Sequence, residues 1–410
     1  MNHTKLEQSL MQELEKLEVI DCHEHLGPEK SRVNSPVDVF TFFSHYTRGD
    51  LAVAGMKQAD YDSLFNRDIP LKRRWQRFRP YWEQIRWGSY ARAALIAARR
   101  FYGADDVNDD TYEQLTEAMQ EANTPGIYER VLREACNIRT CLTQCGSTDL
   151  GGTPLLTPVM PLIWSVETWQ ALTAPSPDGT EPVRTLDDYL DRMRRYVERV
   201  KSEGAVGLKM ISNPYKEPRR DEALAAFEGL RGGSVSQLPA VNPLRDYVVD
   251  QVISRATELD MVVCVHTGYW GDFRTLDPLH MIPILQRHPN ARFDVYHVGY
   301  PWVREALMLG KGFANVWLNF CWTHVISQRF AMDALDEAID LIPANKILAF
   351  GGDYGSPVEK VYGHLVMARE DVARVLAARI ERGQMTESQA MVLARKWFFD
   401  NARDLYRLKV

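Results

Sequence analysis

Residues 17–25 read LEVIDCHEH, a mostly apolar run that ends in two histidines separated by a glutamate. A short run without regular polar alternation is typical of a strand buried on both faces, as in a parallel sheet covered by helices. Seven further runs have this form, and each ends at or leads into a polar or reactive residue. The eight expected strands cover residues 17–22, 138–142, 155–162, 205–210, 261–265, 293–296, 316–320 and 347–351.

Helical patterns separate many of these runs. Residues 186–204 place apolar side chains at steps of three and four and end in glycine, which is typical of a helix and its C-terminal cap. Strand and helix repeated eight times predict a (β/α)8 TIM-type barrel, and we expect one such domain over residues 1–410. The other expected helices cover residues 244–259, 278–287, 331–341 and 388–405.

Two stretches depart from the repeat. About residues 30–135 separate the first expected strand from the second, which is far more than one crossover helix needs, and their patterns predict a helical insertion. Residues 212–243 are rich in charge and glycine and predict a long loop, which we interpret as a lid over the strand ends.

The composition is that of an ordinary folded protein, with 45% hydrophobic and 25% charged residues among 410. A net charge of -6 disfavours sequence-independent nucleic-acid binding, which needs a basic field. No apolar run approaches the roughly 20 residues that span a bilayer. The six cysteines show no framework spacing and the N-terminus lacks a secretion-signal pattern, so we expect a cytoplasmic protein with reduced thiols.

Six side chains that can bind metal or transfer protons stand at or just after the ends of expected strands. In a barrel these ends converge on one mouth, so residues far apart in the chain would meet in a single pocket. The six residues are His23, His25, Lys209, His266, His297 and Asp353.

His23 and His25 flank Glu24 at the end of the first strand. Because side chains alternate along a strand, both imidazoles would reach one metal ion while Glu24 points away. His266 is a natural third ligand, and Asp353 could ligate the ion, take a proton from its water, or merely cap a following helix. These ligand types predict a divalent ion, with Zn²⁺ preferred and Mn²⁺ as the alternative.

His297 and Lys209 each admit two functional roles. His297 could ligate a second ion or act as a free base or electrophile beside the first. Lys209 leaves an apolar strand, where an isolated ammonium is costly. It could be carboxylated and bridge two ions, or stay cationic and hold an anionic substrate group, and a structural ion pair is the remaining alternative. The residues therefore leave open whether the site holds one ion or two.

Aromatic residues follow several strand ends by one to four positions and are expected to form substrate walls. Arginines alternate with aromatics in residues 74–87 of the insertion. We expect these aromatics to pack on the barrel and one or two of the arginines to grip a carboxylate in the pocket. The expected substrate-contacting residues are Tyr269, Trp270, Tyr300, Trp322, Tyr354 and Arg79.

The ordered set H-x-H, Lys, HTG, YH-x-G and F-G-x-D, which extends over nearly all of the chain, resembles the amidohydrolase superfamily of metal-dependent barrels. It is similar to the amidohydrolase-related (type 2) branch, which includes hydrolases, lactonases and decarboxylases, and residues 397–408 (WFFDNARDLYRL) look like the closing helix of that branch. The long insertion, with YERVLREACNIRTCLT at residues 128–143, also resembles uronate isomerases.

The resemblance implies particular roles for the matching residues. His297 matches a second-metal ligand of binuclear members or a catalytic residue of mononuclear ones, and uronate isomerases lack this histidine, which argues against a plain isomerase. Lys209 matches a position that is carboxylated in binuclear members, but many members of the branch lack it. Asp353 matches a ligand that also shuttles protons. The implied metal ligands are His23, His25, His266 and Asp353.

The expected function is hydrolysis of an amide or lactone bond in a small carboxylate-bearing metabolite by a metal-activated water. Alternatives are a metal-dependent decarboxylase and a uronate-type aldose–ketose isomerase on the same barrel. A non-catalytic metabolite sensor is a rival of another class, which a ligand set with a proton shuttle disfavours. We expect a homo-oligomer that binds a small anionic molecule, and neither nucleic acid nor a membrane.

Overall fold

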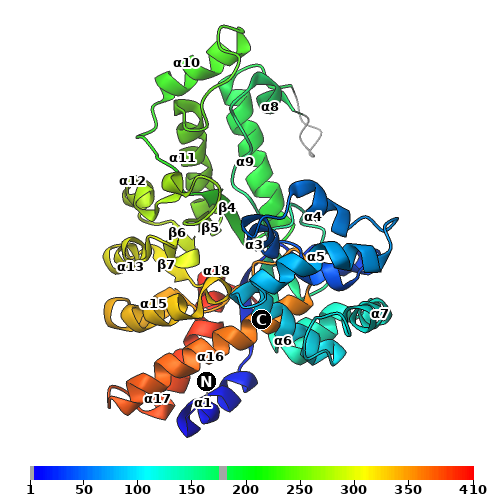
Figure 1. Cartoon of the computed structure of the whole chain (residues 1–410). Helices are drawn as coiled ribbons and strands as arrows, with labels where there is room; N and C mark the ends of the chain where they lie inside the picture. The colour runs from blue at the N-terminus through cyan, green and yellow to red at the C-terminus, as the bar shows by residue number, and fades with distance from the viewer. Residues whose placement is uncertain (1–3, 175–181) are drawn as a thin grey trace.

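The computed structural model describes residues 4–174 and 182–410 (Figure 1). Eight parallel strands pair in chain order, and all eight expected strands are present with boundaries shifted by no more than three residues. The predicted (β/α)8 barrel is therefore confirmed. The strands are β1 (Val19–Glu24), β2 (Ile138–Thr143), β3 (Leu156–Pro161), β4 (Gly207–Ile211), β5 (Val262–His266), β6 (Arg292–Tyr296), β7 (Val316–Asn319) and β8 (Ile347–Leu348).

Backbone hydrogen bonds bring β1 against the segment that follows β8 and nearly close the ring. The Cys22 amide donates to the Phe350 carbonyl at 3.1 Å, and the Asp353 amide donates to the His23 carbonyl at 2.7 Å. The carboxyl ends of the first and last strands are thereby held side by side. This seam matters for the site because three candidate ligands lie on its two sides.

Helices surround the barrel and cover the outer face of its strands, while the inner face is buried by side chains that fill the barrel (Figure 1). Most of the expected helices are present. One long helix, α16, was not predicted, because it lies between α1, α6 and α15 and is buried on several sides without a single apolar stripe. None of the described helices is both long and apolar enough to cross a membrane. The main helices are α1 (Lys5–Lys16), α9 (Leu186–Ser202), α11 (Pro243–Glu258), α12 (Ile282–Arg287), α13 (Val303–Gly312), α15 (Gln328–Leu341), α16 (Glu359–Glu381), α17 (Glu387–Arg395) and α18 (Asn401–Tyr406).

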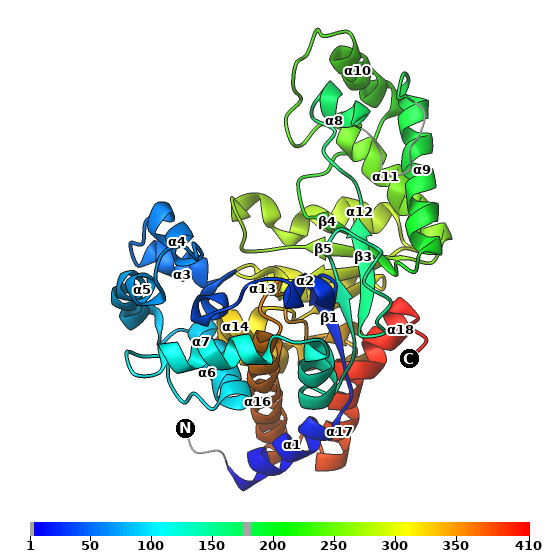
Figure 2. The ribbon, with the colours of Figure 1, turned by 90° about the vertical axis from the view of Figure 1, so that its right-hand side faces the viewer.

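The helical insertion lies between β1 and β2, as predicted, and sits beside the barrel (Figure 2). Its aromatic residues were expected to pack on the barrel, but many of them form a separate core inside the insertion. The Phe43 ring lies 4.7 Å from both the Phe78 and Trp82 rings. The insertion contains α2 (Glu29–Val33), α3 (Thr47–Val53), α4 (Gln58–Leu64), α5 (Leu71–Ile85), α6 (Ser89–Tyr102) and α7 (Tyr112–Ala122).

Residues 212–243 do not form the expected loop over the strand ends. They contain α10 (Arg220–Arg231), which buries Ala223, Phe227 and Leu230 and packs against α11. Together with α8 (Trp169–Thr173), α9 and α11, this helix forms an arm that projects away from the barrel (Figures 1 and 2). The prediction of one long loop was wrong because a helical spacing of apolar residues was hidden among many charges, although Asn213 and Ala240, near the two ends of the segment, do lie at the strand ends.

Candidate active site

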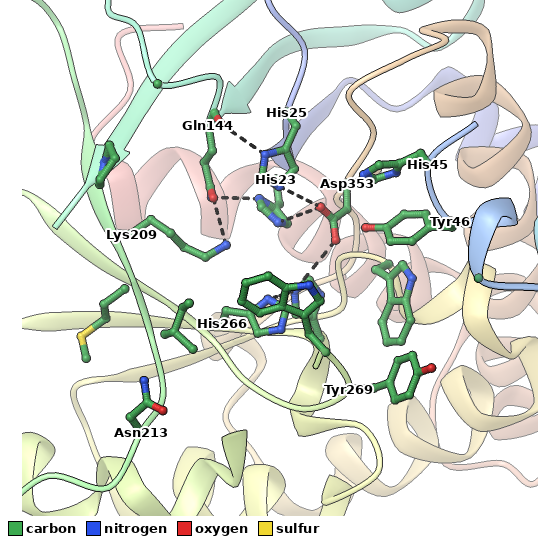
Figure 3. A pocket seen from close by; sticks show the side chains of 18 of the residues that line it. His23, His25, His45, Tyr46, Gln144, Lys209, Asn213, His266, Tyr269 and Asp353 are labelled. Carbon is green, nitrogen blue, oxygen red and sulfur yellow. Dashed lines mark hydrogen bonds and ion pairs between the residues drawn. The ribbon is translucent and has the colours of Figure 1, made fainter. Parts of the chain in front are cut away.

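A cavity of about 1190 Å³ opens at the carboxyl ends of the strands. Residues from β1, β4 and β5 and from the segments after β6 and β8 meet in its wall (Figure 3). The structure therefore brings together the six side chains that the strand ends carry. These are His23, His25, Lys209, His266, His297 and Asp353.

His23, His25 and Asp353 form a tight cluster at the inner end of the cavity. The Nε2 atoms of His23 and His25 lie 3.0 and 3.2 Å from Asp353 Oδ1. The candidate ligand atoms of all three residues lie within 4.8 Å of one another. His23 and Asp353 are buried, whereas the His25 side chain is 39% exposed. Two imidazoles and a carboxylate with one open side fit a catalytic metal site, in which a position remains for water or substrate.

His266 stands next to this cluster rather than within it. Its Nδ1 lies 3.0 Å from His297 Nε2, and its Nε2 is buried without a hydrogen-bond partner in the described part of the chain. His297 Nε2 in turn lies 3.9 Å from Asp353 Oδ2, and its Nδ1 lies 3.2 Å from the carbonyl of Cys321. The two histidines thus extend the cluster along one wall of the cavity.

The Cys321 thiol also lies near the histidines and forms a second candidate ligand group with His23 and His297. Burial raises the pKa of this thiol well above its usual value. The thiolate is the form that binds metal, and a bound cation promotes loss of the thiol proton. Sequence reasoning did not single out Cys321 as a candidate ligand.

Gln144, just after β2, connects Lys209 to His23 (Figure 3). Lys209 Nζ donates to Gln144 Oε1 at 2.9 Å, so the amide nitrogen faces His23 Nδ1 at 2.9 Å. An ammonium can only donate, which fixes the orientation of the amide and makes His23 Nδ1 the acceptor. The proton of neutral His23 then lies on Nε2. To ligate an ion through Nε2, His23 has to carry its proton on Nδ1 instead. The side-chain amide of Gln144 then has to rotate so that its oxygen accepts from His23 Nδ1.

Lys209 is half-buried and has no carboxylate partner among the described residues. Its ammonium lies 4.5 Å from the centre of the Tyr296 ring, and no carboxylate of the described residues is within ion-pair distance. Burial lowers the pKa of Lys209 below its usual value. A half-buried ammonium whose hydrogen-bond partner is a neutral amide is suited to hold an anionic group of a ligand.

The backbone around Asp353 is held by two buried carboxyl groups. The Gly352 amide donates to Asp21 Oδ1 at 3.2 Å and the Tyr354 amide donates to Glu24 Oε2 at 2.6 Å. Burial raises the pKa of Asp21 to about 7 and that of Glu24 well above its usual value, so the pair does not carry two charges at neutral pH. A Cβ atom on Gly352 would overlap with Glu24 Oε1, which is why glycine is required there.

The alternative role of Asp353 as a helix cap is not observed. The next long helix, α16, begins at Glu359, and its N-cap residue is Val358, which makes no side-chain capping bond. Asp353 instead has a φ of +63°, which a non-glycine residue rarely adopts, and its carboxylate faces the cavity (Figure 3). The rare backbone conformation of Asp353 therefore directs its carboxylate into the cavity and has no part in starting α16.

The charge states suit metal ligation. Burial lowers the pKa of His23 and His266 well below the usual value and that of His297 to about 4, so these imidazoles are neutral at neutral pH. Burial alone would raise the pKa of Asp353, but His23 and His25 beside it hold this pKa well below its usual value. A neutral imidazole and an ionised carboxylate are the forms that bind a divalent ion.

Three of the six expected substrate-contacting residues line the cavity, namely Tyr269, Trp270 and Trp322. Tyr354 is fully buried, and Tyr300 packs against Phe330 with 4.5 Å between ring centres; neither is part of the cavity wall.

Arg79 does not reach the cavity. It lies on the outer face of α5, where it donates to Asp109 at 2.7 Å. The inner face of the same helix is formed by the buried rings of Trp75, Phe78 and Trp82. The expectation that Arg79 grips a substrate carboxylate is therefore wrong.

The insertion supplies a wall that sequence reasoning missed. Tyr46 lies beside Asp353 (Figure 3), and its ring stacks on Tyr90 at 5.2 Å. Trp322 Nε1 donates to the Tyr90 hydroxyl at 2.9 Å, which ties the insertion to the barrel mouth. None of these insertion residues follows a strand, and the only signal was the polar HYTRGD segment between apolar stretches. Further insertion residues in the wall are His45, Arg48 and Asp50.

Comparison with known proteins identifies the family. A family model described as amidohydrolase matches residues 184–408, which is more than half of the chain, and the chain belongs to this family. The predicted resemblance is thereby confirmed. Protein fluG of Emericella nidulans is 26% identical over 175 residues, covering 40% of this chain and 20% of that protein. The match thus spans about a fifth of the length of this curated relative.

Solved structures share the fold over nearly the full chain. Uronate isomerase from Thermotoga maritima superposes with a TM-score of 0.77 at 15% identity, covering 98% of both chains. Glucuronate isomerase from Caulobacter crescentus gives 0.80 at 16% identity, covering 99% of this chain and 94% of that one. A Lactobacillus casei protein proposed to be a metal-dependent hydrolase gives 0.67 at 19% identity, covering 97% of both. At these identities the likeness concerns the fold alone.

Proposed function

We propose that this protein is a metal-dependent hydrolase that cleaves an amide or lactone bond of a small carboxylate-bearing metabolite. The observation that carries the proposal is the cluster of His23, His25 and Asp353, whose ligand atoms lie within 4.8 Å of one another at the inner end of a large cavity. An open side on a cluster of this composition favours catalysis over a purely structural metal site.

The cluster would hold one divalent ion, Zn²⁺ in our proposal with Mn²⁺ as the alternative. When bound, such an ion supplies Lewis acidity and lowers the pKa of a water ligand from roughly 15.7 to about 7. His266 Nε2 has no partner among the described residues and stays available as a further ligand, as the family resemblance implies. Lys209 remains an ammonium in this proposal, which favours one ion over two.

The remaining side chains orient the substrate and move protons. Ionised Asp353 accepts a proton from the attacking water and passes it to the leaving group. Neutral His297 donates its Nδ1 proton to the Cys321 carbonyl at 3.2 Å, so its Nε2 accepts from His266 Nδ1 at 3.0 Å and holds the His266 ring with Nε2 free to bind. Lys209 holds the substrate carboxylate. We further propose a cytoplasmic homo-oligomer that acts on a free anionic molecule and requires neither nucleic acid nor a membrane.

Elemental analysis of the purified protein and of the His23→Ala variant tests the metal site. We expect one equivalent of a divalent ion in the wild type and almost none in the variant. The Arg79→Ala variant is the matched control, since this arginine lies outside the cavity. Unchanged metal content in His23→Ala would refute the ligand role of His23.

Assays with metal-loaded protein test the reaction. A panel of N-acyl amino acids, lactones, aromatic acids and hexuronates is followed for ring or amide opening, CO₂ release and aldose–ketose interconversion. We expect hydrolysis. CO₂ release alone would support the decarboxylase, ketose formation alone would support the isomerase, and tight binding without turnover under any metal would support a sensor.

A further inference from the structure

The outer wall of the cavity carries aromatic side chains that are exposed despite their size. Trp164, Tyr269 and Trp270 are 39%, 53% and 59% exposed, and all three line the cavity. Large apolar side chains left open to water beside a reactive centre are typical of a surface that a ligand covers.

These rings are continuous with the reactive end. The Trp270 ring lies 5.6 Å from the His266 ring in an edge-to-face arrangement. Tyr269 is parallel to Trp322 at 6.3 Å, and Trp322 lies 5.6 Å from the His297 ring. A molecule that extends outward from the reactive histidines therefore meets aromatic faces and edges first.

The cavity is also larger than a small acid needs. Its volume of about 1190 Å³ exceeds the roughly 300–1,000 Å³ that is common for pockets of drug-sized ligands. A compact acid bound at the inner end would leave most of this space, and the exposed rings, in contact with water. The hydrophobic effect favours a substrate that covers them.

Two arginines in the cavity wall already have partners. Arg48 donates to Gln58 Oε1 at 2.7 Å and lies over the Tyr61 ring. Arg245 donates to Asp246 Oδ1 at 2.8 Å and to the Pro214 carbonyl at 3.0 Å. Arg245 is thus paired with a carboxylate, whereas Lys209 has the neutral Gln144 amide as its hydrogen-bond partner among the described residues, which leaves its charge for an anionic group of a ligand.

We propose that the substrate is a carboxylic acid that carries a flat aromatic group. Its carboxylate binds Lys209, its reacting bond lies at the cluster of His23, His25 and Asp353, and its ring packs against Trp270. The assignment of the reacting bond rests on the proposed function. The assignment of the ring and the carboxylate rests on the cavity wall and can be tested by binding alone.

A matched pair of acids tests the proposal by calorimetry. N-benzoylglycine and N-acetylglycine share a carboxylate and an amide and differ in the ring. We expect N-benzoylglycine to bind about tenfold more tightly or better, because burying a phenyl ring adds that much. Glucuronate, a polyhydroxylated acid without a ring, should bind no better than N-acetylglycine.

Variants connect the preference to particular side chains. Trp270→Ala should reduce the preference for the benzoyl acid to about threefold or less while leaving the affinity for N-acetylglycine nearly unchanged. Lys209→Met should weaken the binding of both acids but not of benzamide, which lacks the carboxylate. Trp87→Ala is the control, because Trp87 is 85% exposed and lies outside the cavity wall. Trp270 stands on an exposed loop, and thermal melting verifies that each variant folds.

The outcomes separate this inference from the proposed function. Equal affinities for the two acids, or a benzoyl preference that survives Trp270→Ala combined with Trp164→Ala, would overturn the aromatic substrate. Binding of both acids that is unaffected by Lys209→Met would overturn the carboxylate anchor. A retained ring preference without hydrolysis of any acid in the panel would refute the hydrolase and leave the substrate class in place.

Discussion

The carboxylate of Glu24 accepts a 2.6 Å hydrogen bond from the backbone amide of Tyr354, which lies 330 residues further along the chain. Asp21 accepts the Gly352 amide in the same way at 3.2 Å. The two carboxyls thus hold the amides on both sides of Asp353, whose φ of +63° needs such support. The middle residue of the H-x-H motif therefore orients a third candidate ligand instead of binding metal itself.

Replacing Glu24 by alanine should weaken metal binding by about 10–100-fold, the range found when a group that orients a ligand is lost. Glu24→Gln keeps an oxygen acceptor for the Tyr354 amide and should bind metal nearly as well as the wild type. Competition with a chelator measures the Zn²⁺ affinity, and far-UV circular dichroism verifies the fold. Equal affinities of the alanine variant and the wild type would show that Asp353 needs no such support.

Lys209→Met should keep or increase the affinity for one ion. Without the ammonium, Gln144 is free to turn its oxygen toward His23 Nδ1, which leaves Nε2 without a proton and ready to ligate. Gln144→Leu removes that partner and should weaken metal binding by about 10–100-fold. Elemental analysis and chelator competition measure both variants. A wild type with two ions that loses one in Lys209→Met would instead indicate a carboxylated lysine bridging two ions.

Asp353→Asn should leave the metal content largely intact, because an amide oxygen can still ligate. It should lower kcat by about 10²–10⁴-fold, since the group that accepts and returns the proton is gone. Steady-state kinetics with equal metal loading verify this expectation. Full activity of the variant would remove Asp353 from proton transfer.

His364 should make the protein sensitive to acid. This histidine is fully buried, its Nδ1 lies 3.2 Å from the Gly352 carbonyl, and burial lowers its pKa from 6.5 to about 3. Below pH 6.5 the unfolded chain binds a proton that the folded protein refuses until about pH 3. The free energy of unfolding therefore falls by up to about 1.4 kcal/mol per pH unit in this window.

Urea denaturation of His364→Gln at about pH 7, 5.5 and 4.5 tests that sign, because glutamine does not titrate and should make the pH dependence shallower over this range. His280, which is partly exposed on the surface, offers the matched control variant His280→Gln. Identical slopes for the wild type and His364→Gln would contradict the assignment.

The barrel could be predicted because parallel strands that are buried on both faces consist of apolar runs. Such runs can be recognised from the sequence alone. The reactive residues were found for a related reason, since each lies at or just after the end of such a run. Helix α16 escaped prediction because burial from several sides puts His364, Arg369 and Asp371 into its interior faces, which hides the usual one-sided pattern.

The walls of the cavity were harder to predict than its inner end. Arg79 and Trp82 are three positions apart on one helix, yet only the tertiary packing decides that the tryptophan turns inward and the arginine outward. Tyr46 reaches Asp353 through the placement of the whole insertion, which no local spacing records. No sequence motif marks Gln144. Its position directly after a strand end is the signal from which its place in the site could have been predicted.

The seam between β1 and the segment after β8 also determines when, during synthesis of the chain, the candidate metal site can form. A nascent chain leaving the ribosome presents His23 and His25 long before Asp353 is translated, and the three cannot grip an ion together until the eighth strand docks beside the first. A stalled or truncated chain would have only the two histidines and would bind the ion weakly. Tight binding of the metal ion during translation should therefore begin only after the eighth strand has docked and the barrel is complete.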